Sequence, residues 1–305
     1  MSDAAARHDP RRHAWRHDLA AESLRGVVDV PRYVTGGRRQ VMTNAVAVRK
    51  APDSKRGLET ELLFGEIVTV YETADNWSWV QAERDRYVGY VPSAVLSASL
   101  TTATHTVRAA GTFLYPEPDI KSPPTWHLSL NAPLAVVETR ERFAALATGG
   151  FVVAHHIAAI DQPARDFVEM AERFDGTPYL WGGRTRLGVD CSGLVQLAME
   201  AAGLVCPRDS DMQREEIGIA LEIPGPLQSP KSDMADVDGL ARGDLVFWSG
   251  HVGIMTDSHM LLHANGHHMA TVVEPVIDAA VRISKQTGHA VSAIRRPPRL
   301  SARTV

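Results

Sequence analysis

Val189-Asp190-Cys191-Ser192-Gly193 runs directly into an apolar segment, residues 194–203, and so places a cysteine at the expected start of a helix. Apolar residues at positions 194, 195, 197, 198, 201 and 202 cover one helical face, and Gly203 is a natural C-terminal stop. Asp190 is a good N-cap, so Cys191 falls in the first turn. There, unpaired backbone N–H groups and the helix dipole favour a negatively charged sulfur. The segment therefore predicts a nucleophilic cysteine.

A cysteine nucleophile needs a base and a group that orients the base. Residues 242–255 indicate a strand, a tight Ser249-Gly250 turn and a second strand that begins at His251. Residues 260–266 follow as a short apolar strand that carries a second histidine, His263. If these strands are antiparallel neighbours, one imidazole can support the other. The candidate catalytic residues are therefore Cys191, His251 and His263.

Structural roles are the alternative interpretation for such residues. Cys206 fits a buried apolar side chain better than a nucleophile, because it lies past the predicted helix with no base motif attached. The chain has 13 histidines, and those other than His251 and His263 are interpreted as structural. Clustered His and Cys can also bind zinc, but no short paired-ligand spacing is present, so we expect no metal and no cofactor.

The ordered set of motifs resembles the NlpC-type cysteine peptidases, a papain-like family of bacterial cell-wall peptide hydrolases. The matching segments are Tyr179 to Gly183, Asp190 to Gly193, Gly243 to Phe247, His251 to Ile254, and Leu262-His263. The resemblance implies an α+β, papain-like domain in which Cys191 attacks an amide carbonyl. It further implies that His251 takes the thiol proton, that His263 orients the His251 imidazole, and that Tyr179 lines the site near the oxyanion.

Composition narrows the class of partner. The 305 residues allow two or three domains, and 32 basic against 36 acidic side chains give a net charge of −4. This balance argues against nucleic acid or an anionic membrane as the main partner. The first 25 residues are polar and hold no apolar run of signal-peptide length, and no stretch of membrane-spanning length occurs. We therefore expect a cytoplasmic enzyme.

Two segments before the catalytic region have alternating apolar patterns and are interpreted as an internal repeat: Ala51-Pro52-Asp53 corresponds to Glu117-Pro118-Asp119, 66 residues later. The first resembles a bacterial SH3-like domain in Leu62 to Glu66, Trp77 to Val80 and Gly89 to Pro92, and the second is a degenerate copy. The predicted organisation is an N-terminal arm (1–30) with a short helix near residues 19–24, two small SH3-like β-barrels (31–99 and 100–161), the peptidase domain (162–299) and a tail (300–305). The barrels are interpreted either as scaffolding or as a wall across one end of the catalytic groove.

Residues 207–213 bear on the substrate. Ser210 followed by Gln213 is the pattern of a capping box for a short helix. Asp209 would alternatively place a negative charge beside the groove, where a free amino terminus is its natural partner. The sequence resembles family members that remove L-Ala-γ-D-Glu from a following diamino acid and require the free L-Ala amine. That resemblance implies substrate contacts from Tyr179, Ser192, Asp209 and Ser210, and from Glu61 and Tyr87 of the first barrel, with Glu59 and Tyr90 as rivals.

The predicted function is therefore hydrolysis of the γ-D-glutamyl–diamino acid bond in free murein peptides, within cell-wall peptide recycling. Two alternatives use the same scaffold. One is an acyl or amide transferase, and the other is a non-catalytic protein that binds wall fragments. The intact set of Cys191, His251 and His263 disfavours the second.

Overall fold

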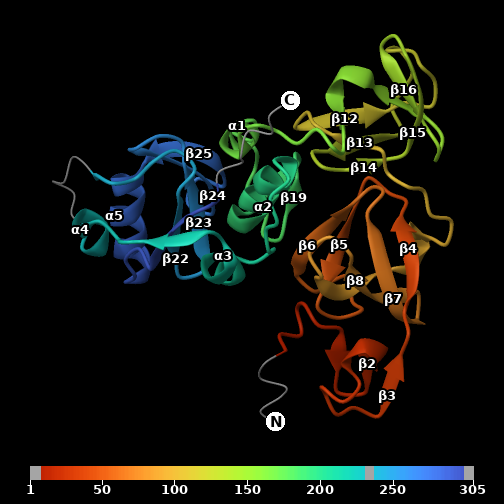
Figure 1. Cartoon of the computed structure of the whole chain (residues 1–305), viewed down its shortest axis with the longest axis horizontal. Helices are drawn as coiled ribbons and strands as arrows, with labels where there is room; N and C mark the ends of the chain where they lie inside the picture. The colour runs from red at the N-terminus through yellow and green to blue at the C-terminus, as the bar shows by residue number, and fades with distance from the viewer. Residues whose placement is uncertain (1–7, 231–236, 299–305) are drawn as a thin grey trace. The chain divides into compact units, whose positions relative to one another are not determined.

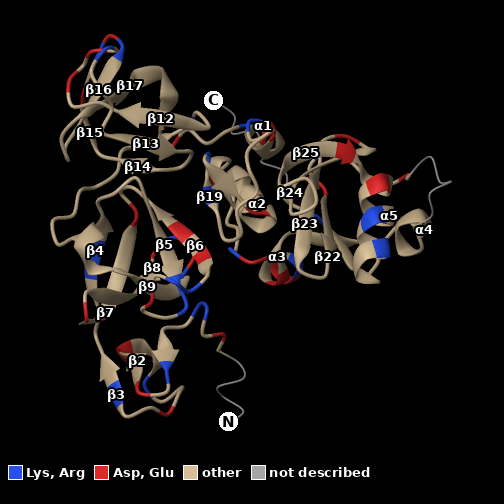
Figure 2. Ribbon diagram, turned by 180° about the vertical axis from the view of Figure 1, so that it is seen from behind, with Lys and Arg blue, Asp and Glu red and all other residues tan. Residues whose placement is uncertain are grey.

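The structure, a computed structural model, describes residues 8–230 and 237–298. The chain divides into two compact units, residues 1–162 and 163–305 (Figure 1). The predicted C-terminal tail, 300–305, lies outside the described residues. Figure 2 shows that acidic and basic residues are interspersed along both units, in keeping with the small net charge.

The described part of the N-terminal segment is folded, which corrects the prediction of an extended arm with a helix near residues 19–24. It forms a three-stranded sheet in the order β1 (Trp15–Arg16), β2 (Leu19–Ala21), β3 (Arg32–Val34), with a 3-10 turn at Glu22–Leu24. Successive strand residues point to opposite faces. Leu19 accordingly packs with Trp79, whereas Ala20 packs with Leu24 and Val28 on the other side. Burial on both faces explains why a short apolar run in a polar segment becomes a strand.

Residues 37–97 form a seven-stranded sheet in the order β10-β4-β7-β8-β9-β5-β6. The strands are β4 (Gly37–Val41), β5 (Ala45–Arg49), β6 (Leu58–Leu63), β7 (Ile67–Ala74), β8 (Trp77–Ala82), β9 (Val88–Pro92) and β10 (Leu96–Ser97), with a 3-10 turn at Ser93–Val95. Asp75 and Asn76 join β7 to β8 with positive φ values of 50° and 65°, as a two-residue hairpin turn requires. Alternate valines such as Val46, Val48 and Val80 fill the core.

Residues 105–159 form a second succession of short strands, which ends, as the first does, with a 3-10 turn and a final strand. They are β11 (His105–Val107), β12 (Gly111–Leu114), β13 (Trp126–Ser129), β14 (Pro133–Leu134), β15 (Val136–Arg140), β16 (Phe143–Leu146), β17 (Phe151–Val153) and β18 (Ile157–Ala159), with a 3-10 turn at Ala154–His156. They form three small sheets around fully buried Leu128, Leu130 and Leu134. The assignment of this segment as a second SH3-like barrel stays a prediction.

The second unit combines helices with one six-stranded antiparallel sheet, β21-β26-β22-β23-β24-β25. Its strands are β21 (Ile219–Leu221), β22 (Leu245–Trp248), β23 (His251–Met255), β24 (Met260–Asn265), β25 (Ala270–Pro275) and β26 (Ala293–Arg296), and a small hairpin joins β19 (Arg184–Thr185) to β20 (Gly188–Val189). Its helices are α1 (Phe167–Glu172), α2 (Cys191–Ala201), α3 (Ser210–Glu216), α4 (Gly225–Gln228) and α5 (Val276–Thr287). In Figures 1 and 2 the strands β23 and β24 lie between α2 and α5.

Local patterns located the elements that carry the predicted catalytic residues. The helix that starts at Cys191, the strand that starts at His251 and the strand that carries His263 are all confirmed. The helix α1 begins at Phe167, where the side chain of the N-cap Asp166 accepts a hydrogen bond from the Val168 backbone N–H. It packs inward, since Met170, Ala171 and the following Phe174 are buried.

Replacing Leu19 with Ala tests whether the N-terminal sheet belongs to the fold. Leu19 has no exposed surface, so Leu19→Ala should lower the free energy of unfolding by about 2–5 kcal/mol, as other buried Leu→Ala changes do. Leu100, which is 41% exposed, provides the control, and Leu100→Ala should change stability by less than about 0.5 kcal/mol. Urea unfolding followed by tryptophan fluorescence measures both. Equal effects would mean that the segment is not part of the cooperative unit.

Candidate active site

Cys191 occupies the first position of α2, directly after its N-cap Asp190. One Asp190 carboxylate oxygen, Oδ1, accepts a hydrogen bond from the Gly193 backbone N–H at 2.7 Å. The sulfur of Cys191 accepts hydrogen bonds from the backbone N–H groups of Ser192 and Val252. Since Val252 follows His251 in β23, the thiol lies against the start of the strand that carries the predicted base.

The helix start alone does not produce a thiolate, which corrects the expectation from sequence. Cys191 is only 7% exposed, and burial raises the pKa of its thiol to about 12. The negative charge of Asp190 raises the pKa further, while the two backbone N–H groups and Arg208 lower it. Desolvation outweighs the favourable dipoles, so Cys191 is a neutral thiol until a base takes its proton.

His251 and His263 are joined directly, with 2.8 Å between His251 Nε2 and His263 Nδ1. The hydrogen-bonded series then continues to a residue that sequence reasoning missed: His263 Nε2 lies 2.6 Å from Glu274 Oε1. Arg282 of α5 donates two hydrogen bonds to the same carboxylate, at 2.5 and 2.6 Å. The register of β24 and β25 pairs His263 with Val272 and Leu261 with Glu274, so Glu274 and His263 occupy diagonal positions on one face.

Both imidazoles are neutral at physiological pH. Part of His251 reaches the surface, but desolvation of its ring, with smaller contributions from His263 and Arg282, lowers the pKa to about 3 despite the opposing effect of Glu274. His263 is fully buried, and desolvation lowers its pKa despite the opposing effect of Glu274. Burial would raise the pKa of Glu274, but hydrogen bonds from His263 and Arg282 prevail and lower it to about 2. The arrangement is therefore thiol, two neutral imidazoles and a carboxylate.

A buried ion pair fixes the loop that carries the thiol. Arg208, with 1% of its side chain exposed, donates to both Asp190 oxygens, at 3.0 Å to Oδ1 and 2.8 Å to Oδ2. Asp190 Oδ2 also accepts from the Gly182 backbone N–H at 2.8 Å. Arg208 additionally donates to Ser192 Oγ at 2.8 Å. Asp190 thus connects three segments: the glycine turn, the start of α2 and the Arg208 loop.

Two glycines permit this close packing. Gly182 has a φ of +73°, a conformation that L side chains rarely adopt. A Cβ at Gly193 would lie 2.5 Å from the backbone oxygen of Gly183, so no larger residue fits there. Gly182 is therefore favoured by its backbone conformation, and Gly193 is required by the close approach of the Gly183 backbone.

The predicted substrate contacts of this unit lie around the same loop. Tyr179 is half-buried; desolvation raises its pKa to about 12, with a further contribution from nearby Cys191, so its hydroxyl keeps its proton. Ser192 is buried and held by Arg208. Asp209 is the N-cap of α3 and Ser210 its first residue, and both are partly exposed.

The capping-box interpretation of Ser210 and Gln213 is wrong. The N-cap is Asp209, and the Gln213 amide instead donates to the backbone oxygens of Ser192 and Pro207, at 2.9 and 2.8 Å. The Gln213 side chain therefore makes tertiary hydrogen bonds in place of the capping bond that the local motif predicts. Gln213 therefore fixes the start of α3 against the start of α2.

The barrel candidates belong to the first unit. A cavity of about 380 Å³ there is lined by Tyr87, Glu59 and Tyr90, together with Arg16, Trp79 and further residues. Glu61 is not among the described residues that line this cavity. Tyr90 has a structural partner, since Arg16 donates to its hydroxyl at 3.0 Å. Of the two rival glutamates, the cavity favours Glu59, whereas both rival tyrosines, Tyr87 and Tyr90, line it.

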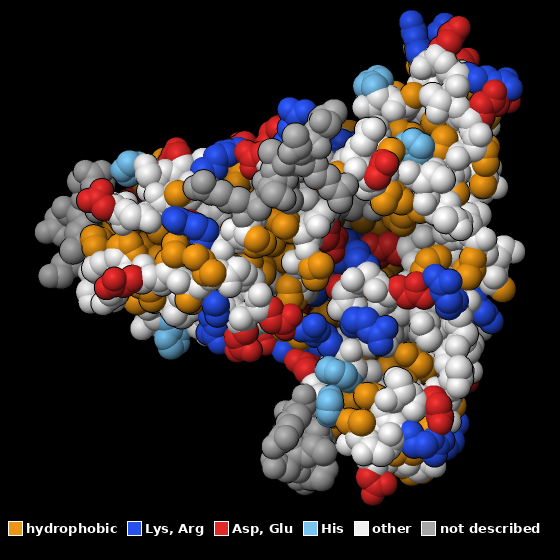
Figure 3. Space-filling view, in the orientation of Figure 1, with side chains coloured by type: hydrophobic (Ala, Val, Ile, Leu, Met, Phe, Trp, Pro, Cys, Tyr) orange, Lys and Arg blue, Asp and Glu red, His pale blue; other side chains and the backbone are white. Residues whose placement is uncertain are grey.

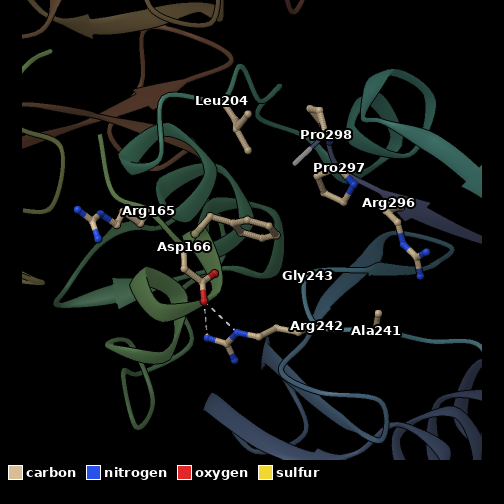
Figure 4. A pocket seen from close by; sticks show the side chains of 10 residues that line it. Arg165, Asp166, Leu204, Ala241, Arg242, Gly243, Arg296, Pro297 and Pro298 are labelled. Carbon is tan, nitrogen blue, oxygen red and sulfur yellow. Dashed lines mark hydrogen bonds and ion pairs between the residues drawn. The ribbon is translucent and has the colours of Figure 1, made fainter. Parts of the chain in front are cut away.

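A second cavity, of about 300 Å³, lies in the peptidase unit and is lined by Arg165, Phe167 and Gly243 among others (Figure 4). The Asp166 carboxylate accepts a hydrogen bond from Arg242 Nε at 2.9 Å beside it. None of the predicted site residues is among the described residues that line it.

Within the described residues, no group of three or more His, Cys, Asp or Glu side chains is arranged to hold a metal ion. None of the helices in those residues combines the length and apolar character needed to cross a membrane. Hydrophobic, basic and acidic side chains are interspersed over the face shown in Figure 3.

The fold and this site define a papain-like cysteine peptidase domain. Residues 176–286 match the NlpC/P60 family, and residues 48–96 match the bacterial dipeptidyl-peptidase Sh3 domain. The catalytic segment is therefore an NlpC/P60 domain, and an SH3-like domain precedes it in the chain. It is homologous to dipeptidyl-peptidase 6 of Lysinibacillus sphaericus, with 27% identity over 70% of this chain and 82% of that protein.

Two further comparisons agree. The γ-D-glutamyl-L-lysine dipeptidyl-peptidase of Bacillus subtilis (strain 168) is 28% identical over 70% of this chain and 71% of its own length. A crystal structure of an NlpC/P60 family protein from Bacillus cereus matches with a TM-score of 0.67, over 86% of this chain and 99% of that one, at 20% identity. The latter shows a shared fold.

Replacing Arg208 with Met tests the buried ion pair. Arg208→Met leaves the Asp190 carboxylate without its cation in a dry site, so the free energy of unfolding should fall by about 3–5 kcal/mol. The control is Arg173→Met, which removes an ion pair whose side chains are 38% and 61% exposed and should cost at most about 1 kcal/mol. Urea unfolding measures both, and similar losses would contradict the role given to Arg208.

Proposed function

We propose that this chain is a cysteine peptidase that hydrolyses the γ-D-glutamyl–diamino acid bond of free murein peptides whose N-terminal L-Ala is unblocked. It would release L-Ala-γ-D-Glu as part of cell-wall peptide recycling, and the proposal includes a cytoplasmic location. The observation that carries it is the Cys191 thiol seated against the start of the His251 strand, with His251 joined to His263. The names of the homologous dipeptidyl-peptidases support the substrate class.

In the proposed reaction, His251 accepts a proton and then returns it, first when the thioester forms and again when it is hydrolysed. His251 takes the proton of Cys191, so the thiolate and the imidazolium form together and stabilise each other. The thiolate attacks the γ-carbonyl carbon, a C–S bond forms, and the protonated Tyr179 hydroxyl donates to the developing oxyanion. The C–N bond then breaks as His251 returns the proton to the leaving amine. Water hydrolyses the thioester with His251 again as base, which restores the thiol.

Recognition of the free amine is the second part of the proposal. We assign Asp209 and Ser210 beside α3, Ser192 beside the thiol, and Glu59 with Tyr87 of the first unit as substrate contacts. The cavity in the first unit supports Glu59 in place of Glu61, the residue first favoured from sequence. A blocked amino terminus would remove the charged donor that Glu59 is proposed to bind, at a cost of about 1.5–3 kcal/mol. Intact crosslinked murein should then be a poor substrate.

The organisation of the first unit is also part of the proposal. We assign residues 100–161 as a second SH3-like barrel, supported by the 3-10 turn ahead of the last strand in both segments. A murein-derived peptide is then the only partner that the proposal requires.

Replacing Cys191 with Ala tests the chemistry. Because Cys191 is the assigned nucleophile, Cys191→Ala should lower release of L-Ala-γ-D-Glu from L-Ala-γ-D-Glu-diaminopimelate by more than about a thousandfold. Cys206 provides a matched control: it is 4% exposed, forms no disulfide and has its thiol 3.4 Å from the Pro207 backbone oxygen, so Cys206→Ala should retain turnover. Mass spectrometry of the digests measures both. Retained turnover in Cys191→Ala would refute the assignment.

Replacing Glu59 and Glu61 separately tests amine recognition. Hydrogen bonds to charged groups contribute about 1.5–3 kcal/mol, so Glu59→Gln should lower kcat/KM for the free-amine peptide about 10- to 100-fold. The neighbouring Glu61→Gln should have the smaller effect. Wild-type protein should discriminate against the N-acetylated peptide, and Glu59→Gln should lose most of that discrimination. Equal cleavage of free and acetylated peptides by the wild type would remove the argument for amine recognition.

A further inference from the structure

The hydrogen-bonded series does not end at the histidine pair. It continues from His263 to Glu274 on the neighbouring strand and from Glu274 to Arg282 on α5. The side chain of His263 is fully buried, and the side chains of Glu274 and Arg282 are only 14% and 18% exposed. Each link is 2.5 to 2.8 Å long, so the order of donors and acceptors is constrained from one end to the other.

The carboxylate sets that order. A carboxylate held by Arg282 only accepts hydrogen bonds, so His263 Nε2 must carry a proton. In neutral His263 the Nδ1 atom is then an acceptor, and His251 must present a protonated Nε2 to it. Neutral His251 is left with its lone pair on Nδ1. That atom is the one ring nitrogen of the pair not used within the series, and it is therefore the atom available to take the Cys191 proton.

We propose that Glu274, fixed by Arg282, is a positioning residue that selects the Nε2–H tautomer of both histidines and thereby makes His251 Nδ1 the catalytic base. The proposal deepens the peptidase function proposed above and rests on it. Glu274 touches neither the thiol nor the substrate in this scheme, and it acts through His263.

Orientation rather than net charge is the basis of this role. Glu274 raises the pKa of His251 and Arg282 lowers it, so the two charges oppose each other at the base. His268, the other ionisable group acting on His263, also lowers the pKa of His263. The Trp248 ring lies 5.7 Å from the His251 ring and contributes no charge. Because these charges oppose each other, we base the role of Glu274 on the fixed pattern of hydrogen-bond donors and acceptors.

Glu274→Gln inverts this pattern without changing the size of the side chain. Arg282 requires an acceptor, so the amide oxygen turns toward it and the amide NH₂ faces His263 Nε2. His263 must then accept at Nε2 and donate from Nδ1, His251 must accept at Nε2, and the proton of neutral His251 moves to Nδ1. The base would no longer have a lone pair directed at the thiol.

The matched control is Glu200→Gln. Glu200 also pairs with an arginine, at 2.6 Å to Arg184, and its side chain is likewise 14% exposed, but its partners do not include the histidine pair. Three readouts are used on the full chain: long-range ¹H–¹⁵N NMR of the histidine rings, the pH profile of Cys191 alkylation by iodoacetamide with Cys206 as internal reference, and kcat and KM on the free-amine peptide.

In the wild type we expect the Nε2–H tautomer for both His251 and His263. Glu274→Gln should shift both toward Nδ1–H, slow alkylation of Cys191 about 10- to 100-fold, and lower kcat by a similar factor with KM within about twofold. Glu200→Gln should leave the tautomers unchanged and alkylation within about twofold of the wild type. Arg282→Gln should move the acidic limb of the alkylation profile to higher pH, because removing the cation raises the pKa of His251.

The wild-type spectrum alone can overturn the proposal. An Nδ1–H tautomer at either histidine contradicts it, even if Glu274→Gln does not fold. Unchanged tautomers and alkylation in folded Glu274→Gln, or the same loss in Glu200→Gln, also contradict it. Absence of turnover on murein peptides by the wild type, with the expected tautomers and reactivity intact, would refute the substrate and leave the positioning role in place.

Discussion

The ion pair between Asp190 and Arg208 is the constraint on which the catalytic unit depends. Two charges are removed from water there, and such a pair is stable only where the remaining lone pairs and protons are satisfied. Asp190 meets that condition, because its two oxygens accept from the Gly182 and Gly193 backbone N–H groups as well as from Arg208. The position of the sulfur is thus set by a charge network and not by helix packing alone.

Burial has a double consequence for the reacting groups. It raises the pKa of the Cys191 thiol and lowers the pKa of the His251 imidazole, so each group is uncharged in the resting state. Neither can hold a lone charge cheaply in this environment, and proton transfer must create both charges at once. Because the site is dry, the thiol can lose its proton only as the base gains it. In water, each of the two groups could become charged independently.

Sequence predicted what local rules determine. The N-cap at Asp190, the turn at Gly250 and the strand starts depend on neighbouring residues, and they were found. Arg208, Glu274 and Arg282 were missed because no sequence motif marks them and their partners lie on other elements: Arg208 follows α2 and binds Asp190 before it, and Glu274 on β25 binds His263 on β24. The Gln213 side chain failed as a capping residue for the same reason, since tertiary partners claimed it. The signal that could have found Glu274 is strand register, which the sequence leaves open.

The unit uses a buried glutamate–arginine pair twice, and the comparison separates structure from function. In the first pair, Arg184 binds Glu200 and also donates to the side-chain amide of Gln196, whose donor and acceptor atoms are chemically fixed. Glu274 and Arg282 end on His263, whose ring can exchange donor and acceptor atoms by moving one proton. The Glu200 carboxylate therefore holds an arginine that binds α2, whereas the Glu274 carboxylate is proposed to select a histidine tautomer. The Glu274–Arg282 pair has a functional role because its partner, His263, can adopt either of two tautomers. His263 is in turn hydrogen-bonded to His251, the proposed base for the Cys191 thiol.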